Sequence, residues 1–261
     1  MLPNVLNFSL LALALFAAVL ACLEIGWRVR HKRRDEESPD ADSGLGAIDG
    51  AVYGLMGLLI AFTFTGAAAR FEVRRELITK EANAIGTAWL RLDLLPAAAQ
   101  PPIRADFRDY VDSRIKTYQL GQSGDIAGAW AEFARSNGLQ TKVWKDAVVA
   151  CQQQSSAAVT SLMMSSLNDM IDITTTRYVA ILTHPPLAIY LVLGFLVLAS
   201  ALLGGYGMGK SGKRNWTHML LYSAALALAM YVILDLDYPR VGVIRIDAMD
   251  HIMVDLRNSM N

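Results

Sequence analysis

Four runs of the sequence contain no Asp, Glu, Lys or Arg, and they constrain the fold more than any other feature. They are Met1–Leu23, Gly50–Ala69, Tyr178–Gly209 and Asn215–Leu234. Each holds roughly the 20 apolar residues that an α-helix needs to cross the hydrocarbon core of a bilayer. Hydrophobic residues make up 54% of the chain and charged residues only 18%, which excludes a secreted or cytosolic globular protein. The sequence therefore predicts an all-α membrane protein with four transmembrane helices.

We divide the chain on this basis and expect a helical domain inserted between the second and third transmembrane helices. The four transmembrane helices are predicted at residues 1–27, 49–71, 185–206 and 216–238. A charged loop, the helical extramembrane domain, a basic loop and a C-terminal tail are predicted at residues 28–48, 72–184, 207–215 and 239–261.

A cleaved signal peptide is the alternative for the first run, because Val19–Cys22 is similar to a lipoprotein cleavage site. Two observations favour a membrane helix. No Lys or Arg precedes the run, and five basic residues follow it within residues 28–34, as in a stop-transfer sequence. We therefore expect the first segment to remain in the membrane.

The basic residues of the loops predict the orientation, because loops rich in Lys and Arg stay in the cytoplasm. Loops 28–48 and 207–215 hold eight basic residues, whereas the C-terminal tail holds three and the N-terminal arm none. We expect a multi-pass protein of the cytoplasmic (inner) membrane whose termini and helical domain face the extracytoplasmic side. Arg70, Arg74 and Arg75 lie at the far end of the second helix and oppose this orientation.

Residues 72–184 show a helical period and no strand-like alternation. The helices that we expect are a continuation of the second transmembrane helix to Pro96, then Pro101–Gln119, Ile126–Ser136 and Leu139–Thr183. Asn137-Gly138 is predicted to end the third of these in a left-handed cap. The last helix is either continuous or interrupted at Gln152–Ser156. We expect this domain to have too small a core of its own to stand far from the membrane.

The sequence contains no phosphate-binding loop, dinucleotide fingerprint, nucleophile elbow or paired metal-ligand motif. Cys22 and Cys151 are too far apart in sequence to indicate a disulfide framework or a metal cluster. The four histidines are interpreted as interfacial or exposed: His31, His184, His218 and His251. The chain has 24 basic and 24 acidic residues, so no net charge attracts nucleic acid. We expect no enzyme activity, no catalytic residues, no cofactor, no metal site and no nucleic-acid partner.

Charged residues gather where the second and fourth transmembrane helices reach the same membrane surface. They are Arg70, Arg74 and Arg75 on one helix and Asp235 and Asp237 on the other. Acidic groups at a helix C-terminus oppose the helix dipole, and charges near hydrocarbon are costly unless they are paired. We interpret the five residues as a clamp of ion pairs. The alternatives are an anion vestibule formed by the arginines or a cation site formed by the aspartates.

The second transmembrane helix carries a periodic apolar pattern. Leu55, Leu58 and Phe62 recur at helical spacing, and Thr65 adds a hydroxyl group. Ordinary helix packing explains this pattern. The alternative is an apolar constriction built from the same helix of several subunits, as in channels that gate by dewetting. Gly50 and Gly54 form a pair of small residues that permits a close approach of another helix.

Two stretches of the chain resemble the bacterial bestrophin-like family. They are LLIAFTFTGAAARFEVRRELITKEANAIGTAWLRLDLLP (58–96) and VILDLDYPRVGVIRI (232–246). Together with the four crossings and the helical middle, the resemblance covers nearly the whole chain. The family is named for a distant similarity to bestrophins, which are pentameric anion channels of all-helical fold. The resemblance therefore implies a homo-oligomer, a pentamer, that passes inorganic anions across the lipid bilayer.

In bestrophins the second transmembrane helix lines the pore, and apolar side chains one turn apart form a neck. Carried over to this sequence, the neck falls on Leu58 and Phe62, and Gly66 follows one turn later. Leu55 and Thr65 complete our set of pore-lining candidates. The acidic calcium-binding run of animal bestrophins has no counterpart here, since two carboxylates fall short of the six to eight oxygens that Ca²⁺ takes. The alternative function is a non-conducting membrane sensor or interaction module that uses the helical domain.

Overall fold

The computed structural model describes residues 5–33, 45–209, 214–240, 242–246 and 249–260. Every regular element within these residues is a helix, as the sequence predicted. The helices are α1 (Val5–Arg33), α2 (Leu45–Arg91), the 3₁₀ turn η2 (Leu92–Leu94), α3 (Gln100–Ser123), α4 (Ile126–Gln154), α5 (Ala157–Leu182), α6 (Leu187–Met208), α7 (Trp216–Asp237) and α8 (His251–Ser259).

Four helical stretches in the described part of the chain are long and apolar enough to cross a membrane. They are Phe8–Arg33, Gly46–Leu94, Ala157–Met208 and Trp216–Asp237. Each contains much of one of the four charge-free runs, and the predicted all-α fold with four membrane helices is confirmed. These runs form helices because, in lipid, a single apolar segment can pair its backbone N–H and C=O groups with one another only in a helix.

The chain divides into two compact units. The first, which we call the membrane unit, comprises Met1–Arg70 and His184–Val243, and the second, the helical unit, comprises Phe71–Thr183 and Ile244–Asn261. Helix α2 contributes its first part to the membrane unit and its second part to the helical unit.

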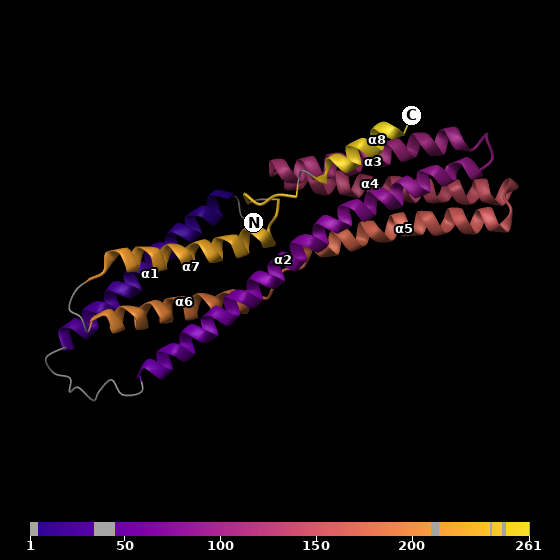
Figure 1. Ribbon diagram of the computed structural model, residues 1–261. Helices are drawn as coiled ribbons and strands as arrows, with labels where there is room; N and C mark the ends of the chain where they lie inside the picture. Colours follow the sequence, from indigo (N-terminus) through magenta and orange to yellow (C-terminus); the bar gives the residue numbers. More distant parts are fainter. Residues whose placement is uncertain (1–4, 34–44, 210–213, 241, 247–248, 261) are drawn as a thin grey trace. The chain divides into compact units, whose positions relative to one another are not determined.

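In the membrane unit, α1 packs against α6 and α7 (Figure 1). The contact with α6 is a contact between backbones. A β-carbon on Gly26 would overlap the carbonyl oxygen of Leu202, and one on Gly205 would overlap that of Leu23. Small residues are therefore required on both helices. The pair that the sequence offered, Gly50 and Gly54, has open space around both residues instead.

The helical unit has a core of its own, contrary to the expectation that its core would be too small. The second part of α2, α3, α4, α5 and the C-terminal residues surround it. Phe107 and Tyr110 of α3 and Leu167 of α5 are fully buried there. The C-terminal segment adds Met253 and Met260 to the same core. It also forms α8, which packs against α3 and which the sequence analysis treated only as part of a tail.

The helix ends of this unit correct the prediction of a left-handed cap at Asn137-Gly138. Asn137-Gly138 does not end a helix, because α4 continues through it to Gln154. Ser136, Gln140 and Val143 keep one buried face through this point, and packing of that face outweighs the roughly 1 kcal/mol that glycine costs in a helix. The left-handed residue is instead Gly124, with φ of 84°, after α3.

The long helix expected over Leu139–Thr183 is interrupted, as one of the two alternatives had it. The break lies at Ser155 and Ser156, between α4 and α5. The hydroxyl of Ser156 accepts a hydrogen bond from the Val159 backbone N–H at 3.3 Å. It therefore caps α5 in the way typical of serine at a helix start.

Candidate pore face and charge clamp

One face of the membrane part of α2 is left uncovered by the rest of its unit. The four predicted pore-lining residues all lie on this face, which we call the pore face: Leu55, Leu58, Phe62 and Thr65. The side chains of Leu55, Leu58 and Phe62 are 49%, 51% and 65% exposed. The opposite face carries Met56, Thr63 and Ala67, which are buried. At about 100° per residue, the mean directions of the two sets of residues differ by about 140° around the helix.

The hydroxyls of α2 are bound to their own helix. Thr65 donates to the Ala61 carbonyl at 2.9 Å, and Thr63 donates to the Leu59 carbonyl at 2.7 Å. The hydrogen of Thr65 is therefore used internally, and its oxygen presents lone pairs on the pore face. The face as a whole is apolar, with threonine as its polar member.

Asp237, the last residue of α7, is completely buried, and Arg70, Tyr190 and His184 contact its carboxylate. Arg70 Nε donates to its Oδ1 at 2.6 Å, Tyr190 Oη donates to its Oδ2 at 3.0 Å, and His184 Nδ1 lies 2.9 Å from Oδ2. The His184 ring also stacks on Tyr238, with 4.4 Å between the ring centroids. Because a buried carboxylate is stable only when it is paired, these partners hold the C-terminal end of α7 to α2 and to the start of α6.

Two of these partners escaped the sequence analysis. His184 was interpreted as interfacial or exposed, yet its side chain is 27% exposed and contacts a buried carboxylate. The position of His184 in the sequence could have indicated this contact. His184 and Tyr190 flank the first residues of the third crossing, and antiparallel neighbours bring that end beside the end of α7.

Asp235 and Arg74 form hydrogen bonds with backbone groups. Asp235 is fully buried, and its Oδ1 accepts from the Val243 N–H at 2.8 Å, which folds the segment after α7 back on the helix. Within the helical unit, the buried Arg74 donates from Nε to the Ala180 carbonyl at 3.0 Å and from Nη2 to the Thr183 carbonyl at 2.8 Å. These carbonyls belong to the C-terminal end of α5, where the helix dipole favours a cation.

Arg75 is the exposed member of the predicted cluster. Its Nη1 lies 3.2 Å from Glu72 Oε1, and both side chains are open to solvent. The structure thus brings together Arg70 and Asp237 of the five predicted residues. It gives Arg74 and Asp235 backbone partners and Arg75 a neighbour on its own helix.

The helical unit contains a buried charge cluster that the sequence analysis missed. Glu81 of α2 accepts from Arg114 Nε at 2.7 Å and from Tyr118 Oη at 2.9 Å, and it also pairs with Arg177. The guanidinium of Arg177 lies 4.0 Å from the centroid of the Tyr118 ring. All four side chains are buried.

The charges of this cluster stabilise one another. Burial by itself would raise the pKa of Glu81, but the guanidiniums of Arg114 and Arg177 outweigh burial and lower that pKa to about 2. Burial also raises the pKa of the Tyr118 hydroxyl above its ordinary value. Glu81 is therefore a carboxylate and Tyr118 a neutral phenol at neutral pH. No group of three His, Cys, Asp or Glu side chains in the described part of the chain could hold a metal ion.

The family model of the bestrophin-like domain matches residues 12–249 of the chain. The chain belongs to the bestrophin-like family. The resemblance seen in the two sequence stretches is thereby confirmed. Among curated proteins, none matches this bestrophin-like chain.

Solved structures share the bestrophin-like fold. A leucine-to-threonine variant of a bacterial bestrophin homologue from Klebsiella pneumoniae is 15% identical, with a TM-score of 0.68 over 94% of this chain and 98% of that chain. An isoleucine-to-threonine variant of the Klebsiella pneumoniae homologue is also 15% identical, with a TM-score of 0.65 over 93% and 97% of the two chains. A crystal structure described as that of a membrane protein is 13% identical, with a TM-score of 0.67 over 95% and 98%. At these identities the likeness shows the fold.

Proposed function

We propose that this bestrophin-like protein assembles into a homo-oligomeric channel for inorganic anions, with α2 lining the pore. The observation that carries the proposal is the pore face. Leu55, Leu58, Phe62 and Thr65 are exposed in the single chain, whereas the opposite face of α2 is buried. A pore on the axis of an oligomer requires such a face, because its lining comes from the same helix of every subunit.

The neck of the proposed pore is formed by Leu58 and Phe62. Both side chains are apolar and exposed, and a ring of such side chains closes a pore to ions when it loses its water. The membrane run of α2, Gly50–Ala69, contains no acidic residue, so no ring of carboxylates repels anions there. Five subunits are proposed from the family resemblance.

The clamp at Asp237 holds the pore helix in place. Arg70 follows the membrane run of α2, and its bond to the buried Asp237 ties α2 to α7. Helix α2 is thereby fixed within each subunit while its pore face remains free. We assign Arg70 and Asp237 a positioning role and assign conduction to the pore face.

The proposed location is the cytoplasmic (inner) membrane, with the termini and the helical unit on the extracytoplasmic side. The loop charges support this orientation. A reporter fused after Leu120, active only in the cytoplasm, tests it. An active reporter would reverse the orientation.

Conduction is tested with the purified oligomer in planar bilayers with an anion gradient. We expect currents that Phe62→Ala increases or whose voltage dependence it changes, because the substitution widens the neck. Phe195→Ala is the matched control, since Phe195 of α6 is 69% exposed and Phe62 is 65% exposed. An assembled oligomer that passes no current under varied voltage and pH would overturn the proposal, as would equal effects of the two substitutions.

A second candidate is the non-conducting sensor or interaction module. One observation favours it: the helical unit has an open groove of about 610 Å³ between α4 and α5. A native mass equal to one chain, together with a single stoichiometric partner in cross-linking, would favour this candidate. A monomer has no central axis on which to build a pore.

A further inference from the structure

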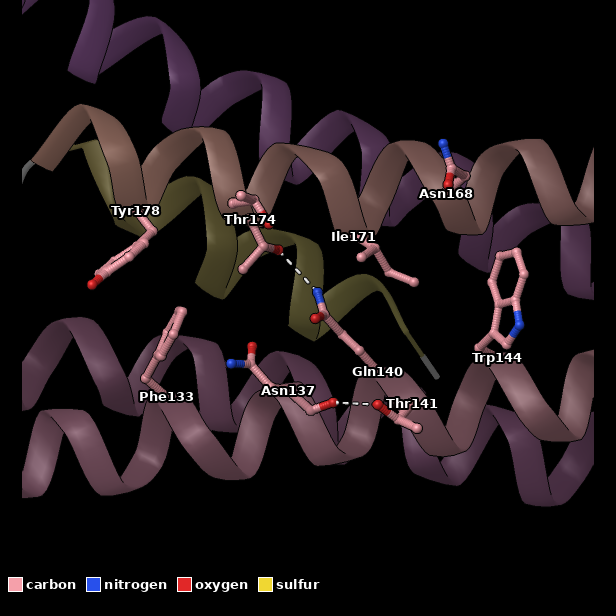
Figure 2. Close-up of a pocket in the computed structure, with 10 residues that line it drawn as sticks. Phe133, Asn137, Gln140, Thr141, Trp144, Asn168, Ile171, Thr174 and Tyr178 are labelled. Atoms are coloured by element: carbon pink, nitrogen blue, oxygen red, sulfur yellow. Dashed lines mark hydrogen bonds between the residues drawn. The ribbon is translucent and has the colours of Figure 1, made fainter.

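The groove between α4 and α5 lies entirely within the helical unit (Figure 2). Its volume of about 610 Å³ falls within the range of about 300–1,000 Å³ typical of small-molecule sites. Phe133 and Tyr178 lie at one end and Trp144 at the other, with Gln140 and Thr174 between them (Figure 2). The described residues that line the groove include no charged side chain.

A hydrogen-bond network of Thr174, Tyr110 and Gln140 forms the floor of the groove. Thr174 Oγ1 donates to the Met170 carbonyl at 3.1 Å, so its hydrogen is used. Tyr110 Oη lies 3.2 Å from Thr174 Oγ1 and must donate in that pair. Gln140 Nε2 lies 3.0 Å from Tyr110 Oη and 2.9 Å from Thr174 Oγ1. Both hydroxyls accept from Gln140 in this arrangement.

In this network the NH₂ group of Gln140 faces the two hydroxyls, so its carbonyl oxygen is directed to the groove that Gln140 lines. The Gln140 side chain is otherwise buried, with 6% of the residue exposed. The groove therefore presents an acceptor at its floor. Thr141, on the rim, donates its hydrogen to the Asn137 carbonyl at 3.0 Å and adds a second acceptor oxygen.

The ends of the groove are aromatic. The rings of Phe133 and Tyr178 stack with 5.5 Å between their centroids, and both are half-buried. Trp144 is half-buried at the other end. Flat aromatic walls favour a flat apolar ligand, and an oriented acceptor favours a ligand with a donor.

We propose that this groove binds an uncharged planar molecule that carries an N–H donor, with the donor bonded to the Gln140 carbonyl oxygen and the ring packed against an aromatic end of the groove. The absence of charged lining residues excludes a strong preference for ions. The site lies in the helical unit and goes beyond the proposed conduction, on which it does not depend.

The probe is indole, compared with 1-methylindole, which has the same ring and no N–H. Binding to the full-length protein in detergent is measured by titration calorimetry and ligand-observed NMR. We expect indole to bind about tenfold more tightly than 1-methylindole, as one well-aligned hydrogen bond allows. Equal binding of the two probes would overturn the proposal, and so would the absence of indole binding.

Two exposed neighbours on α5 provide matched variants. Thr175 lines the groove and Thr176 does not, and both are exposed. Thr175→Trp should fill the groove and weaken indole binding at least about tenfold, whereas Thr176→Trp should leave it unchanged. Because neither substitution touches the buried network, retained helical circular dichroism is expected in both. Unchanged indole binding in Thr175→Trp would place the probe elsewhere and overturn the proposal.

Discussion

Gly66 provides the space in which the Arg70 side chain lies. A β-carbon at Gly66 would sit 3.3 Å from Arg70 Nη1, and Arg70 extends from there to the buried Asp237. Gly66 lies one turn of α2 beyond Leu58 and Phe62, the residues on which the bestrophin resemblance places the neck. A β-carbon here would already require the end of the Arg70 side chain to shift by a few tenths of an ångström, and we expect a larger side chain to shift it further from its carboxylate.

Substitution at Gly66 should therefore loosen the clamp. Gly66→Leu is expected to lower the free energy of unfolding by about 1–3 kcal/mol, because a buried carboxylate loses a charged hydrogen bond. Gly57→Leu is the control, since Gly57 lies on the same helix with open space around it. Thermal unfolding in detergent, followed by helical circular dichroism, measures both. A Gly66→Leu protein as stable as Gly57→Leu would contradict this view of the turn.

The coupling between Arg70 and Asp237 can be measured with a double-mutant cycle. Arg70→Met and Asp237→Asn should each destabilise the protein, and the double variant should lose less than the sum of the two. The expected coupling energy is about 1–3 kcal/mol, as for contacting residues in one network. Additive losses would mean that the two side chains act independently. The pair Arg75 and Glu72, both exposed, should couple by less than about 1 kcal/mol.

The contact between α1 and α6 predicts a large effect of a small change. Gly205→Ala places a methyl group against the Leu23 carbonyl and should force the helices apart, at a cost of about 1–3 kcal/mol for overpacking. Gly207→Ala, two residues later, meets open space and should be neutral or slightly stabilising, because alanine favours helices over glycine. The melting temperatures of the two variants test this prediction, and that of Gly205→Ala should be the lower one. Equal values would show that the helices can shift at no cost.

Stability should depend on pH through Glu81. Its pKa is about 2 in the folded protein and has an ordinary value of 4.5. A carboxyl whose pKa is lowered by folding stabilises the fold above its unfolded pKa, and this stabilisation is lost as the pH falls from 4.5 towards 2. The free energy of unfolding should therefore fall more steeply between about pH 5 and about pH 3 in the wild type than in Glu81→Gln.

The same variant tests the cluster at neutral pH. Glu81→Gln removes the carboxylate that the buried Arg114 and Arg177 share and leaves Arg177 with Asp250, 3.8 Å from its Nη2, and it should cost about 3–5 kcal/mol. Glu76→Gln is the control, because Glu76 is exposed and pairs only with Lys80 on the same helix among its described contacts. Identical pH profiles for wild type and Glu81→Gln would assign the acid sensitivity to other carboxyls.

The membrane helices were predictable from sequence, and the tertiary contacts of the charged groups largely were not. A run such as Asn215–Leu234 predicts a transmembrane helix directly, because a segment that crosses the bilayer needs an uninterrupted apolar composition. Asn137-Gly138 misled the prediction of α4, since a local helix-ending signal is weaker than a continuous buried face. The face of α2 that stays exposed follows from its period, but only the fold shows which side the other helices cover.

The charge clusters are harder to predict because their members are distant in sequence. Asp237 lies 167 residues from Arg70 and 47 from Tyr190, and Glu81 lies 96 residues from Arg177. Each charged residue taken alone is compatible with a solvated surface position. Arg70 and Asp237, which form an ion pair, were grouped because both were predicted to end a crossing on the same side. Arg114 and Arg177 do not lie at the end of a predicted crossing, so their positions in the sequence do not indicate that they meet.

The backbone contact at Gly26 and Gly205 has a consequence for assembly of the chain. Two helices that touch through their main chains leave no gap that a lipid tail could enter, so α1 is retained by its fit to α6 and not only by its peptide link to α2. A protein supplied as two fragments, divided between α1 and α2, should therefore still come together in the bilayer by lateral association of preformed helices.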